Sequence, residues 1–145
     1  MEEAISAIRR TGAEMGLPYL MGLYAEALGD SGRLDGARKS VEADLELGRC
    51  NGTYFQLAEV LRIEAFIREN SGGGPDEIEQ MLHKAANVAT LQRSAIGQLR
   101  IAVELARGLR RRGEVDEARE LIAPHGELVG KLGDSQDGRA ASEFC

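Results

Sequence analysis

The strongest constraint on this chain is an internal repeat. The segment GRLDGAR at residues 32–38 returns as GEVDEAR at 113–119, and a divergent copy, GGPDEIE, lies between them at 73–79. The leading glycines, Gly32, Gly73 and Gly113, recur about every 40 residues, a period typical of stacked helical hairpins. Because such a unit buries its apolar face only against its neighbours, the repeat predicts one continuous architecture.

Apolar residues recur at helical spacing before and after each glycine. A glycine in the left-handed conformation closes a helix, and the acidic residue that follows it favours the start of the next one. We therefore expect antiparallel helical hairpins at residues 17–50, 53–92 and 95–132. The first stripes consist of Leu17, Leu20, Met21, Tyr24 and Leu28 before the turn and Leu34, Ala37, Val41 and Leu45 after it.

The two ends of the chain depart from the repeat. Residues 1–15, with Ile5 and Ile8 on one face, resemble the second helix of a preceding unit, so we expect a fragment of a longer solenoid. Residues 133–145 are mostly small and polar, which predicts a flexible tail in which Phe144 alone could dock. The expected fold is an all-α, right-handed solenoid of about three hairpins that follow an orphan helix.

Composition excludes several classes of function. With 18 basic and 24 acidic residues the net charge is −6, which disfavours binding to nucleic acid or to anionic membranes. The N-terminus lacks the features of a secretory signal, and the longest apolar stretch, residues 17–25, is too short to span a bilayer. Cys50 and Cys145 form neither a disulfide framework nor a metal set. These features predict a cytoplasmic protein.

The small residues around the glycines have a familiar spacing. Ala25, Gly32 and Ala37 match the skeleton of a tetratricopeptide repeat, and Ala106, Gly113 and Ala118 match it again. The middle unit departs from the skeleton because Ile78 stands at the second small position. The period is also longer than the ~34 residues of the standard repeat, which indicates a variant of that family.

A closer resemblance involves the segments RTGA at 10–13, GLPY at 16–19, YAEAL at 24–28 and GEVDEARELIAP at 113–124. Over residues 9–137 the chain resembles the C-terminal helical-repeat region of large bacterial predicted ATPases and adenylate/guanylate cyclases. The resemblance implies a regulatory or interaction module, because the catalytic domains of those proteins lie outside the repeats. We therefore expect no enzyme activity in these 145 residues.

No motif predicts a catalytic residue, a cofactor or a metal. The loop SGGGP at 71–75 lacks the lysine of a phosphate-binding loop and continues into Asp76 and Glu77, which would repel phosphate. His83 and His125 lie on different repeats without partners at the spacing of metal ligands. We interpret the first as a lengthened turn and the histidines as ordinary helix residues.

Basic residues gather at Arg107 and at 110–112. One interpretation is structural, because cations stabilise the last turn of a helix. The other follows from the resemblance: in tetratricopeptide folds the first helix of each unit lines a concave surface that binds peptides. By spacing, that surface would contain Tyr19, Glu26, Glu59, Arg62, Phe66, Arg100, Val103, Arg107, Arg110 and Arg111.

This surface would be acidic at one end and basic at the other, and its arginines suit a partner protein or peptide with an acidic segment. The favoured function is thus a non-catalytic protein-interaction or regulatory module that relays contact to upstream domains of its own chain. Two alternatives stay open: a scaffold that self-associates into homo-oligomers, and a free-standing repeat adaptor.

Overall fold

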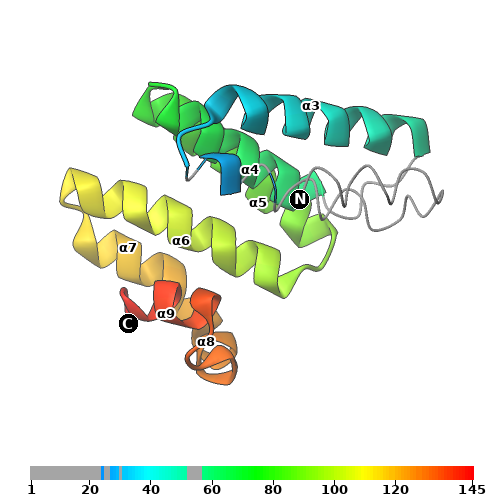
Figure 1. Cartoon of the computed structure of the whole chain (residues 1–145). Helices are drawn as coiled ribbons and strands as arrows, with labels where there is room; N and C mark the ends of the chain where they lie inside the picture. The colour runs from blue at the N-terminus through cyan, green and yellow to red at the C-terminus, as the bar shows by residue number, and fades with distance from the viewer. Residues whose placement is uncertain (1–23, 25–26, 30, 52–56) are drawn as a thin grey trace. The chain divides into compact units, whose positions relative to one another are not determined.

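The computed structural model describes residues 24, 27–29, 31–51 and 57–145 (Figure 1). Within these ranges the chain forms α-helices and one short 3-10 helix but no strand, which confirms the all-α class. The helix expected at 1–15 and most of the helix expected after residue 17 lie outside the described residues, as do Tyr19 and Glu26. The solenoid arrangement stays a prediction.

The described ranges contain a succession of helices. They are α3 (Leu34–Asn51), α4 (Leu57–Asn70), α5 (Pro75–Leu91), α6 (Ala95–Arg112), α7 (Val115–Ile122), the 3-10 helix η2 (Ala123–His125), α8 (Gly126–Leu132) and α9 (Gln136–Ser142).

Three turns close with the same glycine cap. Gly32, Gly72 and Gly113 have φ of 74°, 87° and 86°, in the left-handed region. In the last of these turns the Gly113 N–H donates to the Arg110 carbonyl at 3.1 Å and the Glu114 N–H reaches back to Leu109 at 3.0 Å. This pair of hydrogen bonds is the Schellman motif, and the turns at Gly32 and Gly72 repeat it. The role expected for the repeating glycines is confirmed at Gly32 and Gly113.

In the middle turn the left-handed residue is Gly72, whereas the sequence alignment places Gly73 there. The Gly73 N–H instead makes the longer-range bond of the motif, 2.9 Å to the Arg68 carbonyl. The extra residue of this loop therefore follows the left-handed position. A fourth Schellman turn, at Arg93 with φ 52°, uses no glycine, and the sequence analysis did not anticipate it.

The chain divides into two compact units, Met1–Ile78 and Glu79–Cys145, with the boundary inside α5. In the first unit α3 packs against α4. Their contact buries Ala37 and Val41 of α3 together with Ile63 of α4, which is 1% exposed. The remaining members of this core are Leu28, Val60 and Ile67, flanked by Tyr24, Leu45 and Phe66.

The second unit contains two antiparallel connections. The end of α5 lies against the start of α6, where the Gln98 side chain donates to the Ala89 carbonyl at 3.4 Å. At the opposite ends of these helices Arg112 pairs with Glu79 at 3.0 Å. Helix α7 then returns along α6 (Figure 1).

The second helix of the third hairpin, expected to continue to residue 132, is interrupted. Pro124 lies in the first turn of η2, between the end of α7 and the start of α8. Proline has no N–H to donate and its ring obstructs the preceding turn, so a continuous helix cannot form there.

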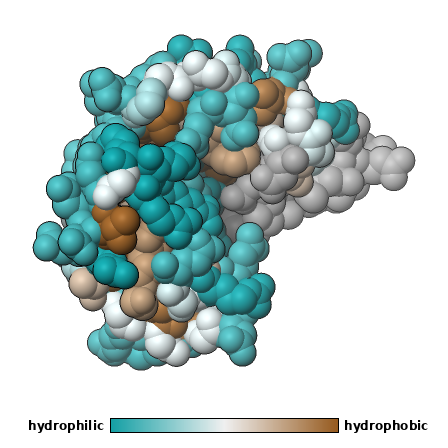
Figure 2. Space-filling model, turned by 90° about the vertical axis from the view of Figure 1, so that its left-hand side faces the viewer, coloured by the Kyte–Doolittle hydropathy of each residue, from teal (hydrophilic) through white to brown (hydrophobic). Residues whose placement is uncertain are grey.

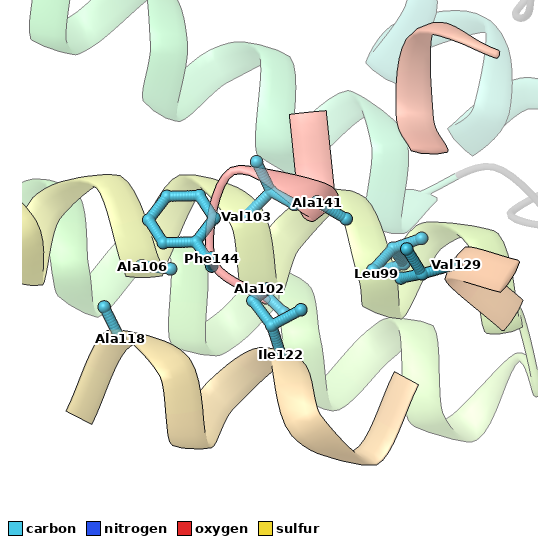
Figure 3. Close-up of a cluster of buried hydrophobic side chains, with 9 residues drawn as sticks. All are labelled: Leu99, Ala102, Val103, Ala106, Ala118, Ile122, Val129, Ala141 and Phe144. Carbon is cyan, nitrogen blue, oxygen red and sulfur yellow. The ribbon is translucent and has the colours of Figure 1, made fainter. Parts of the chain in front are cut away.

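Residues 133–145 differ from the flexible tail that the sequence predicts. Residues 136–142 form α9, capped by Ser135, whose hydroxyl accepts the Gly138 N–H. Phe144 is 5% exposed and belongs to the core of this unit (Figure 3). The composition of the segment is polar, yet two alanines on a short helix and the phenylalanine that follows it provide enough apolar surface to dock.

The glycine caps generate a matched prediction. A Cβ at Gly113 would contact nothing within 4 Å, so the cost of Gly113→Ala is conformational: about 1 kcal/mol of unfolding free energy should be lost. Gly126 also has open space, but its φ is −52°, and Gly126→Ala should stabilise the fold by up to about 1 kcal/mol. Chemical denaturation followed by circular dichroism measures both. Equal effects of the two substitutions would contradict the assignment of the left-handed cap.

Candidate interaction surface

Helix α6 carries the basic residues that the sequence analysis singled out. Arg100, Val103, Arg107 and Arg110 follow one another at intervals of three or four residues, which places them on one face of the helix. We call these four residues the α6 face. Whatever packs on this face meets cationic groups along its length and an apolar residue between them.

Helix α9 packs on the α6 face. Arg100 donates twice to Asp137, from Nε to Oδ1 and from Nη2 to Oδ2, both at 2.9 Å. The guanidinium and the carboxylate form a bidentate pair with two parallel hydrogen bonds, the strongest geometry for such a pair. Both side chains are partly exposed, at 32% and 24%, so water weakens the attraction without abolishing it.

A second anchor lies just after the C-terminal end of α9. Arg110 Nη2 is 3.3 Å from Glu143 Oε2, and its guanidinium lies 4.8 Å from the centre of the Phe144 ring. A cation over an aromatic face is attracted by the negative potential of the ring. Because Asp137 pairs with Arg100 and Glu143 with Arg110, α9 runs parallel to α6.

Phe144 occupies an apolar cluster that α6, α7, α8 and α9 form together (Figure 3). Val103, at the centre of the α6 face, is 4% exposed and belongs to this cluster. The other members are Leu99, Ala102, Ala106, Ala118, Ile122, Val129 and Ala141. The aliphatic floor of the predicted peptide surface is therefore covered by the chain's own residues 136–144.

The remaining arginines of α6 have other contacts. Arg107 is 3.2 Å from Glu104, one turn earlier on the same helix, and Arg111 is exposed. Arg112 joins Glu79 of α5 to Glu114 of the following turn. The hydrogen bonds that Arg112 donates to the Glu114 carboxylate raise the pKa of Arg112 further above its ordinary value. Arg112 thus agrees with the structural interpretation of the basic cluster.

The predicted residues of α4 lie in the first compact unit. Arg62 is 4% exposed and makes two hydrogen bonds to Glu59, at 3.2 and 2.9 Å. Phe66 packs on Gly29, where an added Cβ would lie 2.5 Å from the ring. Arg62 is thus buried rather than at the surface where the sequence analysis expected it, and Phe66 is part of the packing.

Asp137, Glu143 and Phe144 were absent from the sequence-predicted surface. A signal for them exists: Ser135 is a favourable N-cap, Asp137 stands in the first turn that follows, and Ala140, Ala141 and Phe144 recur at helical spacing. Seven residues is too short a window for this periodicity to outweigh a polar composition.

Among residues 24, 27–29, 31–51 and 57–145, no three His, Cys, Asp or Glu side chains gather in a way that could hold a metal ion. No described helix combines the length and apolar character needed to cross a membrane. On the face shown in Figure 2, hydrophilic residues cover most of the described surface and hydrophobic ones form small separate patches.

Comparison with known proteins shows a weak similarity. An uncharacterized protein of Rhizobium meliloti (strain 1021) is 29% identical over 91 residues. The match covers 63% of this chain and 9% of that protein, so the chain corresponds to a small part of its relative. No family model matches the chain, and no solved structure matches it.

The forked ion pair between α6 and α9 predicts a measurable coupling. A double-mutant cycle with Arg100→Ala and Asp137→Ala should give about 1 kcal/mol of coupling in the free energy of unfolding. Lys131 and Glu127 are a matched control, an exposed pair on α8 at 2.6 Å, for which we expect less than about 0.5 kcal/mol. Equal coupling in the two cycles would contradict a specific role for Arg100.

Proposed function

We propose that this chain is a non-catalytic protein-interaction and regulatory module of helical hairpins, and that the α6 face binds a protein or peptide with an acidic segment. The observation that supports this most strongly is the seating of α9. The arginines at the two ends of the face hold one carboxylate of α9 and one just after it, and Val103 shares a buried cluster with the phenylalanine that follows α9.

The chemistry of this contact is that of peptide recognition. Arginine binds carboxylates through two parallel hydrogen bonds and can stack on an aromatic ring, so a few arginines give both orientation and affinity. An aromatic side chain that enters an apolar site typically supplies a large share of the binding energy at protein interfaces. A surface that holds α9 in this way suits other helices with the same side chains.

We further propose that the chain is the C-terminal repeat region of a larger bacterial signalling ATPase or nucleotide cyclase in the cytoplasm. The segments at 10–28 and 113–124, which resemble that repeat region, support this, and so does a match to only 9% of a longer relative. Any ATPase or cyclase activity would then belong to other domains of the protein. Self-association and a free-standing adaptor are the competing functions.

Peptide display on the full chain tests the binding function. The selected peptides should be acidic and contain an aromatic residue. Arg107→Glu with Arg110→Glu should weaken their binding at least tenfold, because the substitutions place carboxylates opposite carboxylates.

The control for this test is Arg119→Glu with Lys131→Glu, which makes the same change in net charge at exposed positions of α7 and α8. It should leave the affinity within about twofold, and circular dichroism should show that both double variants are folded. Selected peptides that bind the Arg107/Arg110 variant as tightly as the wild type would exclude the α6 face as the binding site.

The larger-protein proposal has a direct test in the mass of the native product. An antibody to this region should detect a band several times heavier than 15.7 kDa in the source cell. A band at the mass of the chain alone would favour the free-standing adaptor. In the first case, deletion of the region should change the output of the larger protein.

A further inference from the structure

We propose that residues 134–145 act as an intramolecular stand-in for the partner of the α6 face, and that the partner is a short acidic-aromatic helix that displaces them. This inference rests on the proposed function, because residues 134–145 and the partner would compete for the same surface. Its basis is that the segment presents to α6 the chemical groups an arginine-rich face selects.

The contacts of the segment define a ligand pattern. Asp137 and Ala141 are four residues apart on one side of α9, and Glu143 and Phe144 follow in the turn after its last residue. Each meets a complementary group in the second compact unit: Arg100 for the first carboxylate, the buried cluster for the alanine and ring, and Arg110 for the second carboxylate. A partner should therefore carry a carboxylate, a small residue four positions after it, an acidic residue six positions after it and an aromatic residue seven positions after it.

The α9 helix is suited to replacement. It contains seven residues, and isolated helices shorter than about 12 residues are marginal in water, so its order depends on the surface beneath it. Phe144, two residues beyond the end of α9, is the one large buried side chain of this segment, and the ion pair between Arg110 and Glu143 is nearly half exposed. A longer helix with the same anchors would add contacts without giving up any of these.

The docking of α9 also depends on one glycine. An added Cβ at Gly138 would lie 2.2 Å from the carbonyl oxygen of Gly133 and 3.1 Å from its carbonyl carbon. These are backbone atoms, so no side-chain rotation relieves the contact. Gly138→Ala must therefore open the turn that places α9 on α6, although alanine favours the helix itself. The substitution releases the segment without altering the carboxylates, the phenylalanine or the arginines that make the contact.

The experiment uses the full chain and a fluorescein-labelled peptide of residues 134–145 carrying Cys145→Ser. Fluorescence anisotropy should show at least tenfold tighter binding to the Gly138→Ala variant than to the wild type, because the face is then open. Gly130→Ala on α8, where a Cβ meets nothing within 4 Å, is the matched control and should bind as the wild type does. Adding Arg100→Glu to the released variant should abolish binding.

A second variant that releases the segment keeps the test valid if Gly138→Ala fails to fold. Phe144→Ala removes the buried anchor, and Leu91→Ala removes an apolar side chain that is 84% exposed on α5. The first should raise peptide affinity and the second should not, with circular dichroism confirming the helix content of both. A scrambled peptide of the same composition should bind neither variant.

The outcomes separate the two proposals. Equal binding by wild type and released variants would overturn the stand-in and leave the interaction function standing. If display-selected peptides bind and the peptide of residues 134–145 does not, the proposed partner pattern is overturned. The pattern is also overturned if the scrambled peptide binds as tightly as the peptide of residues 134–145. If neither binds, the proposed function fails as well. A wild-type dimer in light scattering that becomes monomeric with Gly138→Ala would show that α9 occupies a second copy instead.

Discussion

The architecture depends on how each helix is made to stop. A helix leaves carbonyl groups without partners at its C-terminus, and the Schellman turn satisfies them while it reverses the chain, at the cost of one residue in the left-handed conformation. Gly32, Gly72 and Gly113 adopt that conformation without steric cost, whereas Arg93 adopts it although it carries a side chain. These turns have the same hydrogen bonds, and each reverses the chain within a short loop. Within the second compact unit the turn at Gly113 returns α7 along α6, so the amphipathic faces of these two helices can pack.

In the second compact unit, this geometry leaves α6 with more neighbours than a single hairpin provides. Helix α7 covers one side and α9 reaches another, so that α6 contributes Leu99, Ala102, Val103 and Ala106 to a common cluster. The short helices α8 and α9, which follow Pro124, make this arrangement possible. A proline that ends α7 lets the chain turn, and the turn at Gly133 then directs a short helix back onto the arginines. The candidate interaction surface and its occupant thus arise from the same interruption.

Much of the helical pattern was predictable because its causes are local. The glycine caps, the acidic first turns and the apolar periodicity appear within windows of ten to twenty residues, and the hairpin turns at Gly32 and Gly113 were expected from them. The turn at Arg93 was not, because nothing in its composition marks a left-handed residue. Helix α9 was not expected for a related reason: it is too short for its periodicity to be evident, and its order depends on a surface formed by residues far away in the sequence.

The sequence by itself determined the helical class, the positions of the main turns and the concentration of arginines along α6, because propensity, capping and periodicity act between near neighbours. Only the tertiary structure decided which charges meet. Arg100 lies 37 residues from Asp137 and Arg110 lies 33 from Glu143, and no local rule links them. The burial of Val103 beneath a segment of polar composition is likewise a property of the packed unit, because it depends on residues distant in the sequence, Ala141 and Phe144, that pack in the same cluster.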